Sequence, residues 1–174
     1  VFHYTLDNLF ASQGLFEPFM SMKGESGVVS PDACGVERAL SFAKRIEAPL
    51  AIVGKRRDRP NQATATHVIG DVDGKIAVLV DDIIDTAGTI CAGAEVLLRE
   101  GAREVYACAT HGVLSGPALE RLNNSVFTKV VVTDTIPSGE RLDVCSKLQV
   151  VSVASLLAKS IHNIHTGSSV SVLF

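Results

Sequence analysis

Carboxylates follow a short run of core-type residues in the middle of the chain. The apolar residues 78–80 lead directly into Asp81 and Asp82, and a third acid, Asp85, comes shortly after them. A carboxylate is a strong hydrogen-bond acceptor for the two hydroxyls of a sugar diol, and it can also hold a metal ion directly or through water. The residue types therefore predict that Asp81 and Asp82 bind sugar hydroxyls or order a metal site.

Residues 85–89 have the composition of an anion-binding turn. Two of them carry hydroxyl groups, two are small enough for a phosphate to approach the backbone, and a helix-like stretch comes next. Such a turn combines free backbone N–H groups with the positive end of a helix dipole. The alternative, taken from these residues alone, is an acidic turn with a threonine helix cap. The residues that we expect to hold a sugar 5-phosphate are Asp85, Thr86, Ala87, Gly88 and Thr89.

Elements that would position these residues alternate along the chain between strand-like and helix-like patterns. The predicted strands are 27–30, 50–53, 66–72, 75–80, 104–110, 129–136 and 148–153, and the predicted helices are 34–46, 88–100, 116–122 and 154–164. This alternation indicates an α/β fold with a mostly parallel sheet and helices on both faces. Ligands bind at the carboxyl ends of strands in such sheets, and the strand 75–80 delivers the acids there.

Two segments depart from this alternation. An Asp73-Gly74 turn between 66–72 and 75–80 predicts an antiparallel hairpin. The segments 17–26 and 55–65 are the least regular.

Length and charge limit the class of protein. The 174 residues suit one domain over 1–174, and a net charge of −3 argues against nucleic acid or a membrane surface as a partner. No apolar run reaches the ~18 residues of a membrane span, and no signal peptide is evident. Four scattered cysteines predict reduced core thiols and a cytoplasmic protein. His162 and His165 fit a solvated helix end better than a metal pair.

The run D-D-I-I-D-T-A-G-T (81–89) resembles the phosphoribosyl diphosphate (PRPP) binding motif of type I phosphoribosyltransferases and of PRPP synthetases. Further segments resemble the synthetases in particular: 28–39 (V-V-S-P-D-A-C-G-V-E-R-A), 54–61 (G-K-R-R-D-R-P-N), 110–118, 130–137 and 169–174. From about Asp7 to Phe174 the chain is similar to the C-terminal domain of bacterial-type ribose-phosphate diphosphokinase, and this implies a type I phosphoribosyltransferase-like fold.

The resemblance implies an activity and roles for single residues. The family transfers the diphosphoryl group of Mg-ATP to ribose 5-phosphate and forms PRPP and AMP. Lys55 and Arg57 match its catalytic Lys and Arg, in a loop that closes over the phosphates, and Arg57 can also fork to a phosphate. Asp32 matches the Asp associated with Mg2+, although by position it could also cap the helix 34–46.

The chain also departs from the family. Cys34 replaces the first residue of a Gly-Gly pair, where a side chain could crowd the diphosphate or force another backbone angle. No segment matches the family's N-terminal half, so we expect a domain that binds ribose 5-phosphate or PRPP but turns over slowly. By resemblance, it forms a homo-oligomer, a hexamer in the family, or assembles with full-length subunits. A type I nucleobase phosphoribosyltransferase and a non-catalytic PRPP-synthetase-associated subunit remain as alternatives.

Overall fold

The protein is represented by a computed structural model that describes residues 6–56 and 65–173. In chain order its helices and strands are α1 (Ser12–Phe16), the 3-10 helix η1 (Glu17–Met22), β1 (Ser26–Ser30), α2 (Val36–Ile46), β2 (Leu50–Arg56), β3 (Ala65–Ile69), β4 (Ile76–Ile84), α3 (Gly88–Arg99), β5 (Glu104–Gly112), α4 (Ala118–Asn124), β6 (Lys129–Thr133), α5 (Arg141–Val144), β7 (Leu148–Val151), α6 (Ala154–Thr166) and η2 (Ser171–Leu173).

One seven-stranded sheet carries the fold, in the order β3-β2-β1-β4-β5-β6-β7. All neighbouring strands are parallel except β2 and β3, which are antiparallel. The chain leaves β1 toward β2 on one side and later adds β4 on the other side of β1. The order of the sheet therefore reverses between β1 and β4, and such a reversal opens a crevice at the carboxyl ends of the two strands.

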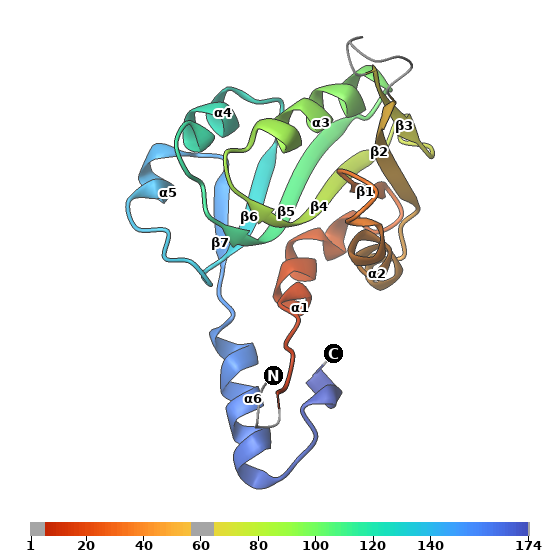
Figure 1. Ribbon diagram of the computed structural model, residues 1–174. Coiled ribbons are helices and arrows are strands. Elements are labelled where there is room, and N and C mark those ends of the chain that lie inside the picture. The colour runs from red at the N-terminus through yellow and green to blue at the C-terminus, as the bar shows by residue number, and fades with distance from the viewer. Residues whose placement is uncertain (1–5, 57–64, 174) are drawn as a thin grey trace.

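Helices cover both faces of this sheet, as predicted (Figure 1). Alternate residues of β4 point to opposite faces: Ala77 and Leu79 belong to the core beneath α3 and α4, and Val78 and Val80 belong to the core beneath α1, η1 and α2. Because both faces are buried, the apolar run of β4 is continuous rather than alternating.

The second core also explains an element that the sequence did not predict. Residues 17–22 form the 3-10 helix η1, where we expected irregular chain. Phe19 of this helix is fully buried and packs edge-on against Phe42 of α2, with ring centroids 5.8 Å apart. Tertiary packing, rather than local periodicity, fixes this turn.

The predicted hairpin around Asp73-Gly74 is wrong, although a tight turn forms there, with Gly74 at φ +66°. Strand β3 pairs with β2, through Val53 and Val68 among others, and does not pair with β4. The two edges of β4 are already occupied by β1 and β5. Gly74 instead donates from its backbone N–H to the carbonyl of Gly101, 2.9 Å away, and so ties the turn to the end of α3.

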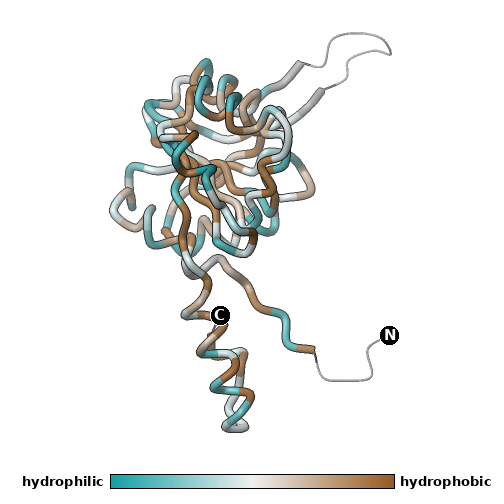
Figure 2. Tube along the Cα trace, turned by 90° about the vertical axis from the view of Figure 1, so that its left-hand side faces the viewer, coloured by the Kyte–Doolittle hydropathy of each residue, from teal (hydrophilic) through white to brown (hydrophobic). Residues whose placement is uncertain are grey.

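Helix α6 and the C-terminal segment project away from the body of sheet and helices (Figure 1, Figure 2). His162 and His165 are exposed on this helix, in agreement with the sequence. Several apolar side chains of α6 are also exposed, with Ile161 at 68% and Ile164 at 58%. Among the described residues, no helix is both long and apolar enough to cross a membrane.

Candidate sugar-phosphate site

The acid pair lies at the point where the order of the sheet reverses. Strand β4 continues to Ile84, so Asp81 and Asp82 belong to the strand instead of following it, which corrects the predicted end at residue 80. Asp81 pairs with Ala109 of β5. The apolar run ends at Val80, but backbone pairing with β5 continues and places both carboxyl groups at the open carboxyl edge.

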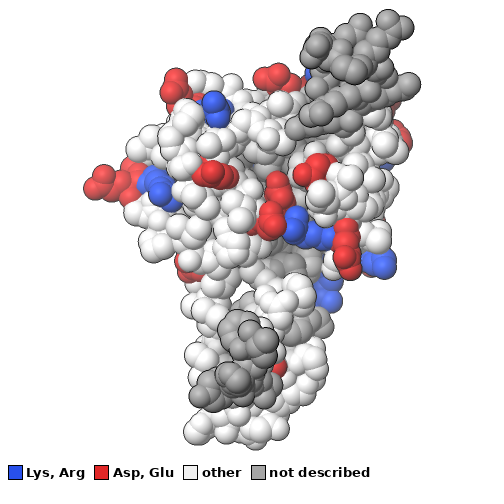
Figure 3. Space-filling model, in the orientation of Figure 1, with Lys and Arg blue, Asp and Glu red and all other residues white. Residues whose placement is uncertain are grey.

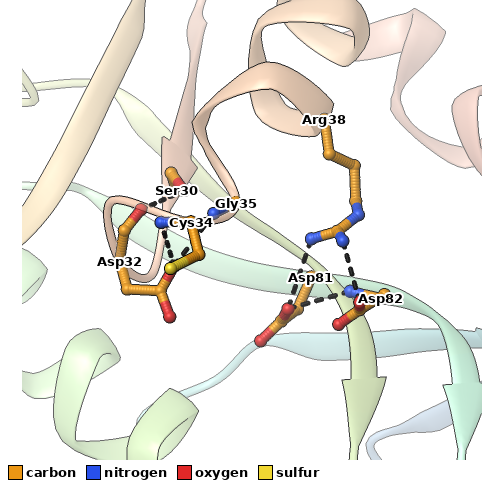
Figure 4. A network of polar contacts seen from close by, with 7 residues as sticks. All are labelled: Ser30, Asp32, Cys34, Gly35, Arg38, Asp81 and Asp82. Atoms are coloured by element: carbon orange, nitrogen blue, oxygen red, sulfur yellow. Dashed lines mark hydrogen bonds and ion pairs between the residues drawn. The ribbon is translucent and has the colours of Figure 1, made fainter.

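Arg38 of helix α2 contacts both carboxyl groups (Figure 4). Its Nη2 lies 2.8 Å from Oδ2 of Asp82, and its Nη1 lies 3.5 Å from Oδ1 of Asp81. The backbone N–H of Asp82 donates to the same Oδ1 of Asp81, at 2.8 Å. One cation from another element therefore bridges two neighbouring anions.

The two carboxyl groups differ in acidity. Burial is the largest influence on Asp81, and together with the charge of Asp82 it raises the pKa of Asp81 to about 6. Burial also acts on Asp82, but hydrogen bonding with Asp81 and the charge of Arg38 outweigh it and lower the pKa of Asp82. Near neutral pH Asp82 is therefore ionised, whereas Asp81 titrates at a pH closer to the physiological range.

Asp32 lies after β1, on the other side of the reversal, and its carboxylate closes a turn. Oδ1 of Asp32 accepts hydrogen bonds from the backbone N–H groups of Cys34 and Gly35, both at 2.9 Å. Helix α2 begins at Val36, with Gly35 as its cap residue and without a side-chain cap. The alternative of Asp32 as the cap of a helix 34–46 is therefore wrong: its carboxylate stabilises the turn before the helix.

Cys34 is accommodated in this turn without strain, because its φ is not positive and its side chain is exposed. This corrects the prediction that all four cysteines lie in the core, although Cys108 and Cys145 are buried. Gly35 is the crowded position of this turn. A Cβ atom there would lie 2.9 Å from Oγ of Ser30 and 3.4 Å from Nη1 of Arg38.

The predicted phosphate turn follows β4 directly. Residues 85–87 bend, and α3 begins at Gly88, with Ala87 as its cap residue in the left-handed conformation (φ 60°, ψ 4°). Ala87 is buried, whereas Thr86 and Thr89 are exposed. No side chain caps this 12-residue helix, and its first N–H groups have no partner within it. The turn therefore offers N–H groups, two hydroxyls and a positive dipole end to an anion.

A second loop, which follows β5, braces the phosphate turn. The backbone N–H of Leu114 donates to the carbonyl of Ile84 at 3.0 Å, and that of Ser115 donates to the carbonyl of Asp85 at 3.1 Å. Oγ of Ser115 also donates to Oδ1 of Asp85. These contacts tie Asp85 to the loop after β5, so its carboxylate helps to shape the turn in which we expect a 5-phosphate to bind.

Arg121 of α4 contacts the backbone of the same turn. Its Nη1 donates to the carbonyl of Thr86 at 2.8 Å. This contact adds a positive charge close to the turn. Local sequence patterns do not single out Arg38, Ser115 or Arg121, although Arg38 and Ser115 lie in the segments 28–39 and 110–118 that resemble the synthetases.

The predicted catalytic residues lie at the border of the described structure. The backbone of Lys55 belongs to strand β2, where it pairs with Thr66, so Lys55 lies in a strand and not in a loop. Its side chain is not described, and Arg57 lies outside the described residues. Of the stretch 55–65 that was predicted to be irregular, residues 55, 56 and 65 lie in strands β2 and β3, and the remainder lies outside the described residues.

Arg38, which contacts the acid pair, also lines a cavity of about 280 Å³. Arg38, His111 and Thr135 contribute polar groups to its wall, and Phe10 and Leu156 contribute apolar ones. Nδ1 of His111 lies 2.9 Å from Oγ1 of Thr135, which fixes the imidazole at the carboxyl edge. Within residues 6–56 and 65–173, no three His, Cys, Asp or Glu side chains gather as a metal cluster.

Comparison with known proteins agrees with this geometry. A family model described as "Phosphoribosyl synthetase-associated domain" matches residues 57–174. The chain is 52% identical over 175 residues to the ribose-phosphate pyrophosphokinase of Caldanaerobacter subterraneus and 51% identical over 177 residues to that of Gloeobacter violaceus, in both cases over 99% of its length.

Solved structures point in the same direction. Phosphoribosylpyrophosphate synthetase from Mycobacterium smegmatis superposes with a TM-score of 0.77 at 37% identity, over 90% of this chain and 50% of that chain. An adenine phosphoribosyltransferase superposes with a TM-score of 0.50 at 21% identity, over 65% of this chain and 71% of that chain, which shows a shared fold alone.

These matches cover nearly all of this chain but only part of each relative. The chain spans 55% of the Caldanaerobacter protein and 52% of the Gloeobacter protein, about half the length of the curated relatives it matches. The acid pair, the braced phosphate turn and the Asp32 turn all lie within the matched part. The chain therefore belongs to the phosphoribosyl synthetase family, whose curated relatives are ribose-phosphate pyrophosphokinases.

Proposed function

We propose that this chain binds ribose 5-phosphate and PRPP, as one half of an enzyme that transfers the diphosphoryl group of Mg-ATP to ribose 5-phosphate. The products are PRPP and AMP. The observation that carries the proposal is the single connection from β4 to α3, which holds the acid pair and the phosphate turn side by side at the reversal of the sheet. The names of the relatives, ribose-phosphate pyrophosphokinase, support it.

Each end of ribose 5-phosphate has a matching group in this site. The ribose hydroxyls donate to the carboxylates of Asp81 and Asp82, and charged acceptors of this kind bind them strongly. The 5-phosphate accepts from the first N–H groups of α3 and from the hydroxyls of Thr86 and Thr89. A sugar held at both ends has one orientation, so that its reaction with ATP occurs between positioned groups.

Asp32 is the residue that we propose for Mg2+. One of its oxygens is occupied by the turn, and among the described residues no group donates to the other. Mg2+ is usually held by one or two carboxylates together with substrate phosphates, so a single Asp suits it, and the lack of a larger cluster in the described part is consistent. When bound, the ion neutralises negative charge on the phosphates.

We propose Lys55 and Arg57 as the catalytic residues, on the basis of the family resemblance. Their charges would stabilise the negative charge that develops on the transferred group. Strand β2, which carries Lys55, is adjacent to β1 and therefore to the Asp32 turn. This adjacency supports a role for Lys55 at the same crevice.

The remainder of the enzyme lies in parts that the relatives contain beyond the matched half. We propose that the adenine of ATP is bound there, and that this chain alone turns over slowly. The exposed apolar side chains of α6 support assembly, either as a homo-oligomer, a hexamer as in the family, or with full-length subunits. Free cysteines fit a cytoplasmic setting.

A chimera tests the proposed function directly. The chain is placed in the Caldanaerobacter pyrophosphokinase in exchange for the segment that it matches, and PRPP and AMP are measured with ribose 5-phosphate and Mg-ATP. We expect activity in the chimera, little in the chain alone, and a loss of about 10²–10³-fold in kcat with Lys55→Ala.

Other results of this assay support the alternatives. Nucleotide formed from PRPP and a free nucleobase, without PRPP synthesis, would indicate a nucleobase phosphoribosyltransferase. A chimera indifferent to Lys55→Ala would indicate a non-catalytic subunit. Rapid PRPP synthesis by the chain alone would contradict the proposed need for a second half.

A further inference from the structure

Arg38 is the feature of the crevice that the proposed chemistry does not yet use. It comes from helix α2, 44 positions before Asp82 in the chain. Its two terminal nitrogens contact two different carboxyl groups, Nη2 with Asp82 at 2.8 Å and Nη1 with Asp81 at 3.5 Å. Figure 4 shows the guanidinium facing both carboxyl groups.

The position of Arg38 in its helix is electrostatically unfavourable. It is the third residue of α2, and the helix dipole disfavours a cation in the first turn of a helix. The other basic residues of α2, Lys44 and Arg45, occupy the last turn, where the dipole favours them. The contacts with Asp81 and Asp82 are therefore the feature that accounts for a cation at position 38.

The surroundings of Arg38 hold its side chain over the crevice. It packs above the Asp32 turn, where a Cβ at Gly35 would lie 3.4 Å from its Nη1. It also lines the cavity that contains His111 and Thr135. The side chain thus connects the turn after β1 with the acid pair of β4, on the two sides of the reversal.

Two neighbouring carboxylates repel each other, and a cation that contacts both offsets this repulsion. The planar fork of Arg is rigid, so it fixes the direction of both acceptors, whereas the single ammonium of Lys contacts one at a time. We propose that Arg38 is a positioning residue that sets sugar specificity, because it holds Asp81 and Asp82 in the arrangement that accepts both hydroxyls of ribose. This inference rests on the proposed function.

Binding of two sugars to the chain tests this inference. Isothermal titration calorimetry compares ribose 5-phosphate with 2-deoxyribose 5-phosphate, which lacks one hydroxyl. For the unmodified chain we expect a preference for ribose 5-phosphate. Arg38→Met should weaken the binding of ribose 5-phosphate by about tenfold, the scale of one charge-assisted contact, and leave the affinity for the deoxy sugar nearly unchanged. Arg38→Lys should restore part of the preference.

Lys44→Met is the matched control, because it removes a cation from the same helix at an exposed position. It should leave both affinities unchanged. If Arg38→Met does not fold, Arg38→Lys tests the inference instead. Its preference for ribose 5-phosphate over the deoxy sugar should then be clearly smaller than that of the unmodified chain.

The outcomes separate this inference from the function on which it rests. No binding of ribose 5-phosphate by the unmodified chain overturns both. Binding with a full preference in Arg38→Met and Arg38→Lys overturns the role of Arg38 alone. An equal loss of both sugars also overturns it, because a general loss of charge or structure would not discriminate between them.

Discussion

At the residue scale, the ionised carboxylate of Asp81 lowers the stability of the folded protein, although the proposed site uses it as an acceptor. Burial raises its pKa to about 6, above the ordinary value of 3.8, so the folded protein favours the protonated form. The contribution of the protonated Asp81 carboxyl to the free energy of unfolding is fully present below pH 3.8 and is lost as the pH rises through about 6. A charge that the fold disfavours is kept where a sugar would need a strong acceptor, which is a common trade between stability and function.

Asp81→Asn should therefore stabilise the protein above pH 7. A change of one pKa unit is worth about 1.4 kcal/mol, and because the carboxyl is partly open to solvent we expect about 1 kcal/mol in the free energy of unfolding. Urea unfolding at pH 5 and pH 8 measures this, with a difference that grows at the higher pH.

Asp82→Asn is the matched comparison. The pKa of Asp82 is lowered, so its stabilising contribution is present at neutral pH and is lost as the pH falls. This variant should be less stable than the unmodified protein at pH 8. The same sign for both variants would show that the two carboxyl groups do not differ as described.

Binding of ribose 5-phosphate should strengthen as the pH rises through about 6, because Asp81 becomes an ionised acceptor. The ligand phosphate also titrates with a pKa near 6, so the pH dependence has two sources. Titration calorimetry of Asp81→Asn separates them, since this variant should retain only the dependence of the phosphate. A pH profile unchanged by the substitution would argue against Asp81 as a ligand of the sugar.

The sequence predicted residues of the site whose roles are local. The turn 85–89 could be recognised because its small residues, hydroxyls and following helix are adjacent in the chain. Arg38 and Ser115 could not be recognised in this way, because they meet Asp82 and Asp85 across 44 and 30 positions. Such pairs depend on how the strands are ordered, which local spacing does not encode.

At the scale of elements, the phosphate turn depends on the loop after β5. Ser115 donates to Asp85 through both its backbone and its side chain, and Leu114 donates to Ile84. Leu114 and Ala87, one in each of the two segments, have positive φ, at 51° and 60°. Non-glycine residues in this conformation persist where the surrounding contacts hold them, as they do here.

Ser115→Ala should therefore weaken ribose 5-phosphate binding without changing sugar specificity. The loss of one hydrogen bond predicts an effect of about 1 kcal/mol, or roughly fivefold in Kd. Calorimetry with ribose 5-phosphate and its 2-deoxy analogue checks both parts. Ser155→Ala, at an exposed position of α6, is the control and should bind as the unmodified chain does.

Element boundaries were predicted well where packing and propensity agree. The helix predicted over 88–100 is α3 (Gly88–Arg99), and Gly101 follows it with φ +92°, as a helix end requires. The partner of β3 was not predictable from the Asp73-Gly74 turn. Whether β3 joins β2 or β4 depends on β1 being inserted between those strands, a long-range property of the sheet.

At the scale of the whole molecule, α6 presents an apolar surface that the body does not cover. Leu157, Ile161 and Ile164 follow helical spacing and are 46%, 68% and 58% exposed. On the face shown in Figure 3, charged side chains gather over the body, and the projecting part carries few. Exposed apolar surfaces of this kind mark sites of association.

The chain should therefore self-associate in solution, and Ile161→Lys should reduce this association. Sedimentation velocity over a range of protein concentrations measures the change. His162→Lys adds the same charge at a neighbouring exposed position outside the apolar stripe and serves as the control. A chain that stays monomeric at every concentration would contradict a role of α6 in assembly.

The central claim is that one crevice, at the reversal of the sheet, binds ribose 5-phosphate at both of its ends. Isothermal titration calorimetry of the chain with ribose 5-phosphate, alongside inorganic phosphate and the Asp81→Asn/Asp82→Asn variant, tests it most directly. We predict that the unmodified chain binds ribose 5-phosphate more tightly than phosphate, and that the variant binds the two alike. Failure of the unmodified chain to bind ribose 5-phosphate, or equal binding of ribose 5-phosphate by the chain and the variant, would contradict the claim.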